Sequence, residues 1–456
     1  MPRLPIVASD GNAWGTVLNE YLTVAHNADG TLKPAAVSSP VGVQNVRAHG
    51  AVGDGVIDDT AAIQAAITAA GVGGVVYLPK TATHYKITAS LDARNIDGLT
   101  IVGSTLYAVI WQYTANTPIL RMGGNGQVVR NLGLFFQSVQ PAANTRAVGL
   151  ELNGNFFSVF DHITVYGAAY GVQCPMQAAW VGQPQNGFFS CSLSNIQVTR
   201  YTNVALDLHS FNGGYLTGSV LSNIYTQNND ANGRQTSNRA LSISGCDEMV
   251  INQFNVEHSR FAQSPILINN ATNVNIGALH VEGAEMTAWG ESLLVVYGNS
   301  SAKVGVMTVD YCFFLATNAA RFGFIYGGAG GSLLVDLLKH NNNTITSTEV
   351  YLIRSTDAST GKIEIMDYRT YNGDVLAGEQ DVNALTIPYV RRVGDNVYAY
   401  RLNGKWVLTG TAAPTAGTWA VGDRVIVTAP VAGGASEYRC TTGGAPGVWK
   451  ALTLAV

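Results

Sequence analysis

Four acidic residues recur at matching places in the second half of the chain. Each directly follows a triplet of the form apolar-x-apolar: Glu257 after FNV (254–256), Glu282 after LHV (279–281), Asp310 after MTV (307–309) and Asp336 after LLV (333–335). If these triplets are strands stacked on one another, the acids form a column with a step of about 4.8 Å. Carboxylates held so close disfavour joint ionisation, so the pKa of at least one of them is expected to rise.

A protonated carboxylic acid beside an ionised carboxylate is the pair that cleaves glycosidic bonds. The two carboxyl groups lie about 5–5.5 Å apart in retaining hydrolases and about 6.5–9.5 Å apart in inverting ones. Neighbouring strands would give the first distance and alternate strands the second. His280 would lie between Glu257 and Asp310, as a base or to orient a sugar. We therefore expect the catalytic residues among Glu257, Glu282, Asp310 and His280, against the alternative of surface acids that bind a cation or face another subunit.

Other polar and aromatic residues could hold the sugar beside these acids. Arg260 could pair with the carboxylate of a uronic acid. Two long inserts, 173–188 and 228–239, would form loops on the same rigid stack, where such side chains suit sugar binding. Solvated loops without a function are the alternative. The candidate substrate-binding residues are Arg260, His258, Trp180, Asp230, Arg234 and Arg239.

The triplets belong to a longer repeat, which would position these acids. Ten of them follow one another at steps of 25–33 residues: LTI (99–101), LGL (132–134), ITV (163–165), IQV (196–198), IYT (224–226), FNV, LHV, MTV, LLV and IEI (363–365). Such a period indicates one unit that stacks to bury its apolar face. Asparagines that tolerate left-handed backbone precede several triplets, at Asn131, Asn195, Asn223 and Asn275. Leucine-rich or helical repeats fit the β-branched triplets poorly, and a β-sandwich would not predict so long a series.

The stretch HGAVGDGVIDDTAAIQAAI (49–67) precedes this repeat. It lacks the lysine of a phosphate loop and the acid spacing of a calcium loop. Asp58 or Asp59 can instead cap a helix over about 58–70, whose apolar stripe ends at Gly71. A buried strand, GGVVYLP, follows. A structural role for these acids is therefore favoured over metal binding.

This order of glycine-acid turn, short helix and buried strand, over residues 45–91, resembles the opening segment of pectate-lyase-like right-handed parallel β-helices, which are common in bacteriophage tailspikes. The resemblance implies that the helix covers the open end of the coil. It also implies a homotrimer that recognises a bacterial surface polysaccharide, and many such proteins cleave it. We expect an all-β fold: a right-handed parallel β-helix over 40–365, with an N-terminal capping helix and a small C-terminal antiparallel β module.

The two ends of the chain depart from the triplet pattern. Residues 1–39 resemble N-terminal segments of predicted tail proteins from phages of actinobacteria, which implies a virion-anchoring segment that contacts a phage tail or baseplate protein. Residues 366–409 indicate a β transition region. Residues 410–456 predict a small β module for trimerisation or sugar binding, in which Trp419 and Trp449 are expected in the core.

Composition narrows the possible partners. The net charge is −4 with 12% charged residues, and no basic run stands out, which argues against nucleic acid. No apolar run reaches the length of a membrane span, and the N-terminus lacks a secretory signal, which counts against a secreted enzyme. The five cysteines include no Cys-x-x-Cys pair, so buried thiols are favoured over disulfides or zinc.

The favoured function is a phage tailspike on the virion that depolymerises a host surface polysaccharide by hydrolysis or β-elimination. One alternative is a receptor-binding tail protein of the same fold without catalysis. A second is a bacterial polysaccharide lyase or epimerase. No cofactor is required for hydrolysis, whereas a lyase could use Ca²⁺.

Overall fold

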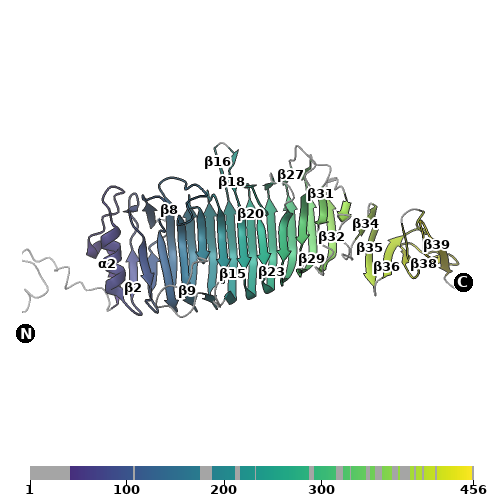
Figure 1. Ribbon diagram of the computed structural model, residues 1–456, viewed down its shortest axis with the longest axis horizontal. Coiled ribbons are helices and arrows are strands. Elements are labelled where there is room, and N and C mark those ends of the chain that lie inside the picture. Colours follow the sequence, from purple (N-terminus) through teal and green to yellow (C-terminus); the bar gives the residue numbers. More distant parts are fainter. Residues whose placement is uncertain are drawn as a thin grey trace, which may run out of the picture.

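The computed structural model describes residues 42–453 except 106–107, 175–186, 211–215, 232, 287–291, 315–321, 329, 346–349, 355–361, 372–377, 381–390, 395–396, 403–404 and 416–417. Its main body is a right-handed solenoid in which strands of successive coils pair in parallel (Figure 1). The predicted all-β, parallel β-helix fold is confirmed.

Two long ladders run along the solenoid. The first ladder joins β2 (Val75–Leu78), β5 (Thr100–Gly103), β8 (Val128–Phe136), β10 (Val159–Tyr166), β13 (Ser192–Thr199), β15 (Leu216–Gln227), β20 (Asp247–Glu257), β23 (Thr272–Glu282), β26 (Ser301–Asp310), β29 (Ser332–Asn341) and β32 (Lys362–Tyr371). The second ladder joins β4 (Leu91–Arg94), β7 (Leu120–Asn125), β9 (Val148–Phe156), β11 (Tyr170–Cys174), β14 (Val204–His209), β19 (Arg239–Ser244), β22 (Ile266–Asn269), β25 (Ser292–Tyr297), β28 (Phe322–Gly327), β31 (Val350–Arg354) and β33 (Gly378–Gln380).

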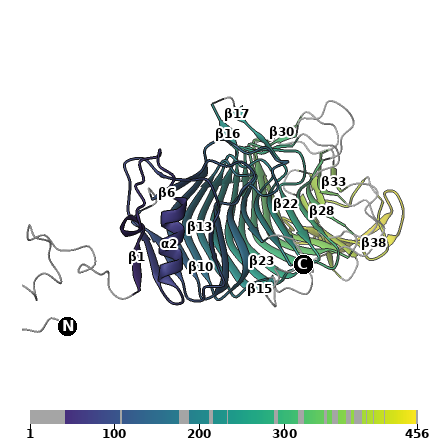
Figure 2. The ribbon, with the colours of Figure 1, turned by 60° about the vertical axis from the view of Figure 1, so that its left-hand side comes forward.

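Shorter strands complete the coils. β1 (Val43–Asn45) pairs with β2, β3 (Tyr85–Ile87) with β6 (Val109–Gln112), and β12 (Phe188–Phe189) with β9 and β15. A third ladder of two-residue strands joins β18 (Thr236–Ser237), β21 (Arg260–Phe261), β24 (Glu285–Met286), β27 (Phe313–Phe314) and β30 (Thr344–Ile345). The hairpin of β16 (Asn229–Asp230) and β17 (Gly233–Arg234) projects from the solenoid (Figure 2).

Alternation of apolar and polar residues explains the core. In β23, Val274, Ile276, Leu279 and Val281 are buried, and they join one apolar cluster that extends along the coils. Strands whose partners lie above and below bury this face without any second sheet. The residues between them are therefore left on the outside of the solenoid.

Asparagine corners within the first ladder are confirmed at three of the four predicted positions. Asn131, Asn195 and Asn223 have φ of 57°, 53° and 52°. The prediction for Asn275 is wrong, because Asn275 is not left-handed; in β23 the asparagine with positive φ is Asn273, at 55°, which lies at a different corner of the coil. The short Asn side chain tolerates this conformation, which turns the chain between two faces of the coil.

The predicted cap is confirmed. Helix α2 (Thr60–Ala70) follows the short 3-10 helix η2 (Val46–His49), covers one end of the solenoid (Figure 1) and buries Ile63, Ala66 and Ile67. Its preceding acids are structural: Asp58 accepts a hydrogen bond from the Thr60 amide, at 3.0 Å. Asp59 accepts bonds from the amides of Val52 and Gly53.

The C-terminal part forms a separate six-stranded sheet. It contains β34 (Arg391–Gly394), β35 (Val397–Leu402), β36 (Lys405–Gly410), β37 (Arg424–Val427), β38 (Ala435–Thr442) and β39 (Val448–Thr453), all antiparallel except the β36–β37 pair. Trp419 is 5% exposed and packs edge-on against Trp449, with ring centroids 5.5 Å apart. The predicted core role is confirmed for Trp419, whereas Trp449 is half-buried and packs against that core.

The cysteines also agree with the sequence. All five, Cys174, Cys191, Cys246, Cys312 and Cys440, are buried thiols. Burial raises the pKa of the Cys312 thiol to about 12, so it stays protonated and inert. Among the helices that the structure describes, none has the length and apolar character needed to cross a bilayer.

Candidate functional site

The first ladder brings three of the four predicted acids into one column. Glu257, Glu282 and Asp310 are the last residues of β20, β23 and β26, and the strand register places each directly opposite the next. Gln227 precedes them on β15 and Asn341 follows them on β29. The column therefore forms because three strands end at the same level of successive coils.

The fourth acid, Asp336, lies outside this column, so that prediction is wrong. Strand β29 pairs Asn341 with Asp310, while Asp336 lies five residues earlier, on another face of the coil. There its carboxylate is 2.9 Å from the ammonium of Lys303. Asp336 is therefore half of a surface ion pair.

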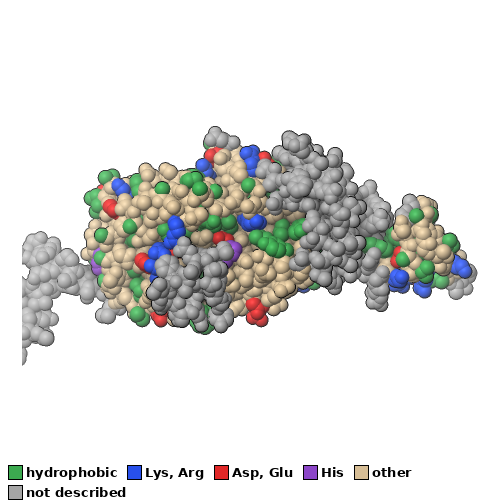
Figure 3. All heavy atoms as spheres, in the orientation of Figure 1, with side chains coloured by type: hydrophobic (Ala, Val, Ile, Leu, Met, Phe, Trp, Pro, Cys, Tyr) green, Lys and Arg blue, Asp and Glu red, His purple; other side chains and the backbone are tan. Residues whose placement is uncertain are grey.

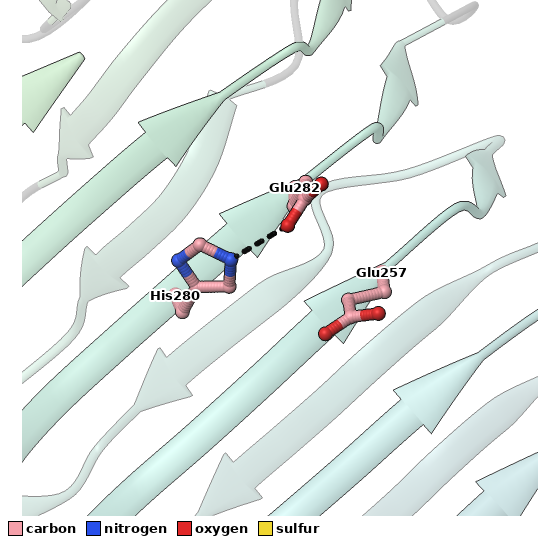
Figure 4. Close-up of side chains that lie close together, drawn as sticks. All are labelled: Glu257, His280 and Glu282. Carbon is pink, nitrogen blue, oxygen red and sulfur yellow. Dashed lines mark hydrogen bonds and ion pairs between the residues drawn. The ribbon is translucent and has the colours of Figure 1, made fainter. Parts of the chain in front are cut away.

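His280 lies beside the acid column: the register places it opposite Asn255 and Thr308, two residues before Glu282, and not between Glu257 and Asp310 as predicted. Its Nε2 is 3.1 Å from Oε2 of Glu282, and its side chain points toward that of Glu282 (Figure 4). One carboxylate oxygen of Glu257, one of Glu282 and a ring nitrogen of His280 all lie within 4.8 Å of one another. All three side chains are half-buried, so the cluster is open to a ligand.

Tyr225 contacts the first acid of the column, Glu257. Its hydroxyl donates to Oε2 of Glu257 at 2.9 Å. Burial, reinforced by the hydrogen bond and the negative charge of Glu257, raises the pKa of Tyr225 well above its ordinary value of 10. The phenol therefore remains a donor at neutral and alkaline pH, and Gln227 Oε1, at 3.0 Å, is a second acceptor for it.

Among the residues that the structure describes, no arginine or lysine pairs with Glu257 or Glu282. Within the described part of the chain, neither carboxylate has an arginine or lysine nitrogen within 4.0 Å; the nearby bases are His258 Nδ1, 4.0 Å from Glu257, and His280. Two carboxylates this close can share one proton or act as an acid and a nucleophile.

The insert that contains β16 and β17 packs beside the column, as expected. Arg234 donates from Nε to the carbonyl of Gly283, the residue after Glu282, and its guanidinium lies 4.1 Å from the centre of the Phe313 ring. His258 follows Glu257 in left-handed backbone, with φ of 42°. These two predicted residues therefore lie at the edge of the acid column.

Other predicted sugar-binding residues form contacts within the protein instead. Arg260 forms a two-point ion pair with Glu285, at 2.8 and 3.2 Å. The geometry thus contradicts a guanidinium unpaired and ready for a uronate. Asp230 pairs with Arg200 at 3.0 Å, and Arg239 donates to the Ser264 carbonyl at 3.2 Å. Trp180 lies outside the described residues.

Comparison with known protein families now adds to this geometry. The family model described as rhamnogalacturonase A/epimerase, pectate lyase-like, matches residues 43–273, just over half of the chain. The chain belongs to this family. The matched residues of this pectate-lyase-like chain contain Glu257, whereas His280, Glu282 and Asp310 lie beyond them.

Individual relatives are more distant. Over 204 residues the pectate-lyase-like chain is 30% identical to mannuronan C5-epimerase AlgE1 of Azotobacter vinelandii, covering 41% of this chain and 14% of the relative. The Acinetobacter phage vb_AbaP_AS12 gp42 tailspike has 13% identity and a TM-score of 0.49, covering 75% of this chain and 64% of that one. Geobacillus virus E2 ORF18 has 14% identity and a TM-score of 0.46, covering 91% and 77%.

Sequence reasoning missed a second polar row, on the second ladder. Asp92, Arg121, Glu151, Gln173 and Asp207 lie opposite one another on β4, β7, β9, β11 and β14. Glu151 is fully buried, and its carboxylate is 2.8 Å from Arg121 and 3.0 Å from Arg146. Asp207 accepts from Gln173 at 3.1 Å and contacts His209. Single outward residues on strands without triplets gave no signal in the sequence.

Proposed function

We propose that this pectate-lyase-like protein binds a bacterial surface polysaccharide and hydrolyses it at the Glu257–Glu282 pair. The observation that carries the proposal is the approach of the two carboxylates, whose oxygens lie within 4.8 Å on adjacent coils. A separation of about 5–5.5 Å between carboxyl groups is that of retaining hydrolases. The family description names a polysaccharide-cleaving enzyme and an epimerase, and the matched relative is named for mannuronan, which supports a polysaccharide as the substrate class.

The surroundings of the two acids assign their roles. Glu257 accepts a hydrogen bond from the Tyr225 hydroxyl, which orients its carboxylate, and we assign it as the nucleophile that attacks the anomeric carbon of the sugar. Glu282 gives its proton to the leaving glycosidic oxygen, and His280 at 3.1 Å orients it. Water then breaks the bond between sugar and Glu257 while Glu282 takes back a proton. The anomeric configuration is retained.

Hydrolysis fits the geometry better than β-elimination does. Elimination needs a base that removes the proton next to the uronate carboxylate. Arg260, the arginine predicted to pair with that carboxylate, forms an ion pair with Glu285 instead. Proposed hydrolysis needs no cofactor. Elimination with Ca²⁺ remains a distinct outcome that chelation would reveal, because Ca²⁺ favours oxygen ligands.

We also propose that the protein is a homotrimeric tailspike, carried on a phage tail through residues 1–39 and acting at the host cell surface. Support comes from the turn, capping helix and buried strand at the start of the solenoid, which resemble the opening segment of tailspikes. A trimer would cover one face of each solenoid. Light scattering of the purified protein measures its oligomeric state, and a monomer would refute the proposed homotrimer.

The chemical test uses purified full-length chain and a panel of bacterial surface polysaccharides. We expect new reducing ends without the ultraviolet absorbance of unsaturated uronates, and no loss of rate with EDTA. Reducing ends together with that absorbance would mean elimination. Binding of a polysaccharide without new reducing ends or unsaturated uronates would refute hydrolysis and favour a receptor-binding protein.

A further inference from the structure

The acid column is one part of a longer outward row. In the same register, toward the N-terminus, Gln227 lies opposite Thr199, Thr199 opposite Tyr166, Tyr166 opposite Phe135, and Phe135 opposite Trp111. The row is therefore continuous from β6 to β26. Aromatic residues occupy its first part, neutral polar residues its middle and acids its last part.

The aromatic part is a stack along the solenoid axis. Ring centroids are 4.5 Å apart between His84 and Trp111, 6.3 Å between Trp111 and Phe135, and 5.5 Å between Phe135 and Tyr166. These steps follow the spacing of the coils. All four side chains are half-buried, so each leaves part of its ring exposed to solvent. We call His84, Trp111, Phe135 and Tyr166 the aromatic strip.

Polar groups border the aromatic strip. The Tyr113 hydroxyl lies 3.1 Å from His84 Nε2, and the Lys86 ammonium lies 4.9 Å from the centre of the Tyr113 ring. On the face drawn in Figure 3, Lys, Arg, Asp and Glu side chains gather in several places on a surface that is otherwise largely neutral. Exposed aromatic edges beside a few hydrogen-bonding groups suit a ligand that carries both C–H surfaces and hydroxyls, as sugars do.

We propose that the aromatic strip binds a linear glycan that runs parallel to the solenoid axis, with successive sugars placed over successive coils and the scissile bond delivered to Glu257 and Glu282. This inference rests on the proposed function, since it names the binding subsite of the same row. Thr199 and Gln227, between the two parts, offer hydroxyl and amide groups to the sugars that connect them.

A second copy of the chain is the rival occupant, but the strip is too narrow for it. Stable protein interfaces bury about 800 Å² on each partner with a broad apolar centre. The strip is narrow: two residues before Phe135 and Tyr166 on the same strands, the corresponding positions hold Gly133 and Thr164, which add no large apolar side chain. A polymer with a single-file contact matches that shape.

Binding assays with substituted full-length protein test the aromatic strip. The probe is a glycan array of bacterial surface polysaccharides, to which polymannuronate and rhamnogalacturonan are added, followed by calorimetry with the polymer that wild type retains. We expect Tyr166→Ala and Trp111→Ala each to weaken Kd roughly 3- to 10-fold. Trp111→Phe should preserve most of the affinity. Phe157→Ala, at a ring that is 63% exposed outside the row, should change nothing.

The outcomes separate this inference from the hydrolysis. Glu282→Gln should bind as wild type does without cleaving. Binding through the strip with no new reducing ends would refute hydrolysis and leave the strip in place. Cleavage with an unchanged KM in the Tyr166 and Trp111 variants would refute the strip alone. Loss of subunit association in those variants would make the row a subunit interface, and an array without any bound glycan would also overturn the proposal.

Discussion

Two rows of charged side chains lie on the same solenoid and differ in the order of their charges. On the second ladder, Asp92, Arg121 and Glu151 alternate in sign from coil to coil. On the first ladder, Glu257 and Glu282 repeat the same sign. The step between coils is about 4.8 Å in both rows. The fold therefore supplies the spacing, and residue identity alone decides whether neighbours attract or repel.

Burial follows from that difference. The Glu151 side chain is 0% exposed between two arginines, whereas the side chains of Glu257 and Glu282 are 24% and 35% exposed. A carboxylate enters the interior only with partners that replace its water. Two carboxylates of like charge without an arginine or lysine partner destabilise the fold slightly. The presence of Glu257 and Glu282 at the same level of adjacent coils therefore favours a functional role for them. The row of alternating charges on the second ladder is structural, and the row of like charges on the first ladder is the candidate site.

The largest expected effect is on catalysis. Glu282→Gln keeps the size of the side chain and its contact with His280 but removes the proton donor. We expect the rate of polysaccharide cleavage to fall about 10²–10⁴-fold, with the melting temperature nearly unchanged. Asp336→Asn, on β29, which pairs with the last strand of the column, is the matched control outside the column and should cleave normally. An undiminished rate in Glu282→Gln would exclude this residue from the chemistry.

The reverse pattern is expected on the second ladder. Glu151→Gln leaves the half-buried Arg121 and Arg146 beside a neutral amide, which should cost roughly 2 kcal/mol of unfolding free energy. Urea denaturation measures that cost. The cleavage rate per folded molecule should stay at the wild-type value at low temperature. A variant that unfolds normally but loses activity would mean that the buried row belongs to the active site.

The two rows also differ in how well the sequence predicts them. The acid column was predictable because an apolar-x-apolar triplet identifies inward residues and fixes the next residue as outward. Glu151 lies on β9, where Gly149 and Asn153 interrupt that pattern. The error at Asp336 has a specific cause: β29 contains two possible triplets, and the one in register, Leu338–Lys339–His340, ends in a fully buried histidine. A buried histidine does not look like a core residue in sequence.

A smaller effect is expected at the edge of the column. Tyr225→Phe removes the hydroxyl that donates to Glu257 and leaves the ring in place. Loss of one such hydrogen bond, worth about 1–1.5 kcal/mol, should lower the cleavage rate roughly 5- to 10-fold if the bond strengthens as Glu257 attacks. Steady-state kinetics on one polymer measures it. A change in KM alone would instead place Tyr225 in sugar binding.

The smallest effect concerns Asp161 on β10, an acid of neither row whose partners are Ser194, Asn195 and the imidazole of His162. Partial burial raises the pKa of Asp161, but bonds from Ser194, Asn195 and His162 outweigh it and hold the pKa at about 2, below the ordinary 3.8. A carboxyl group with a depressed pKa stabilises the fold above its unfolded pKa, and this contribution is lost as pH falls from about 4 to 2. Asp161→Asn should therefore melt slightly below wild type at pH 7, and the two melting curves should converge over that interval. A difference that persists unchanged to pH 2 would show that the side chain acts through packing, which would separate it from both charged rows.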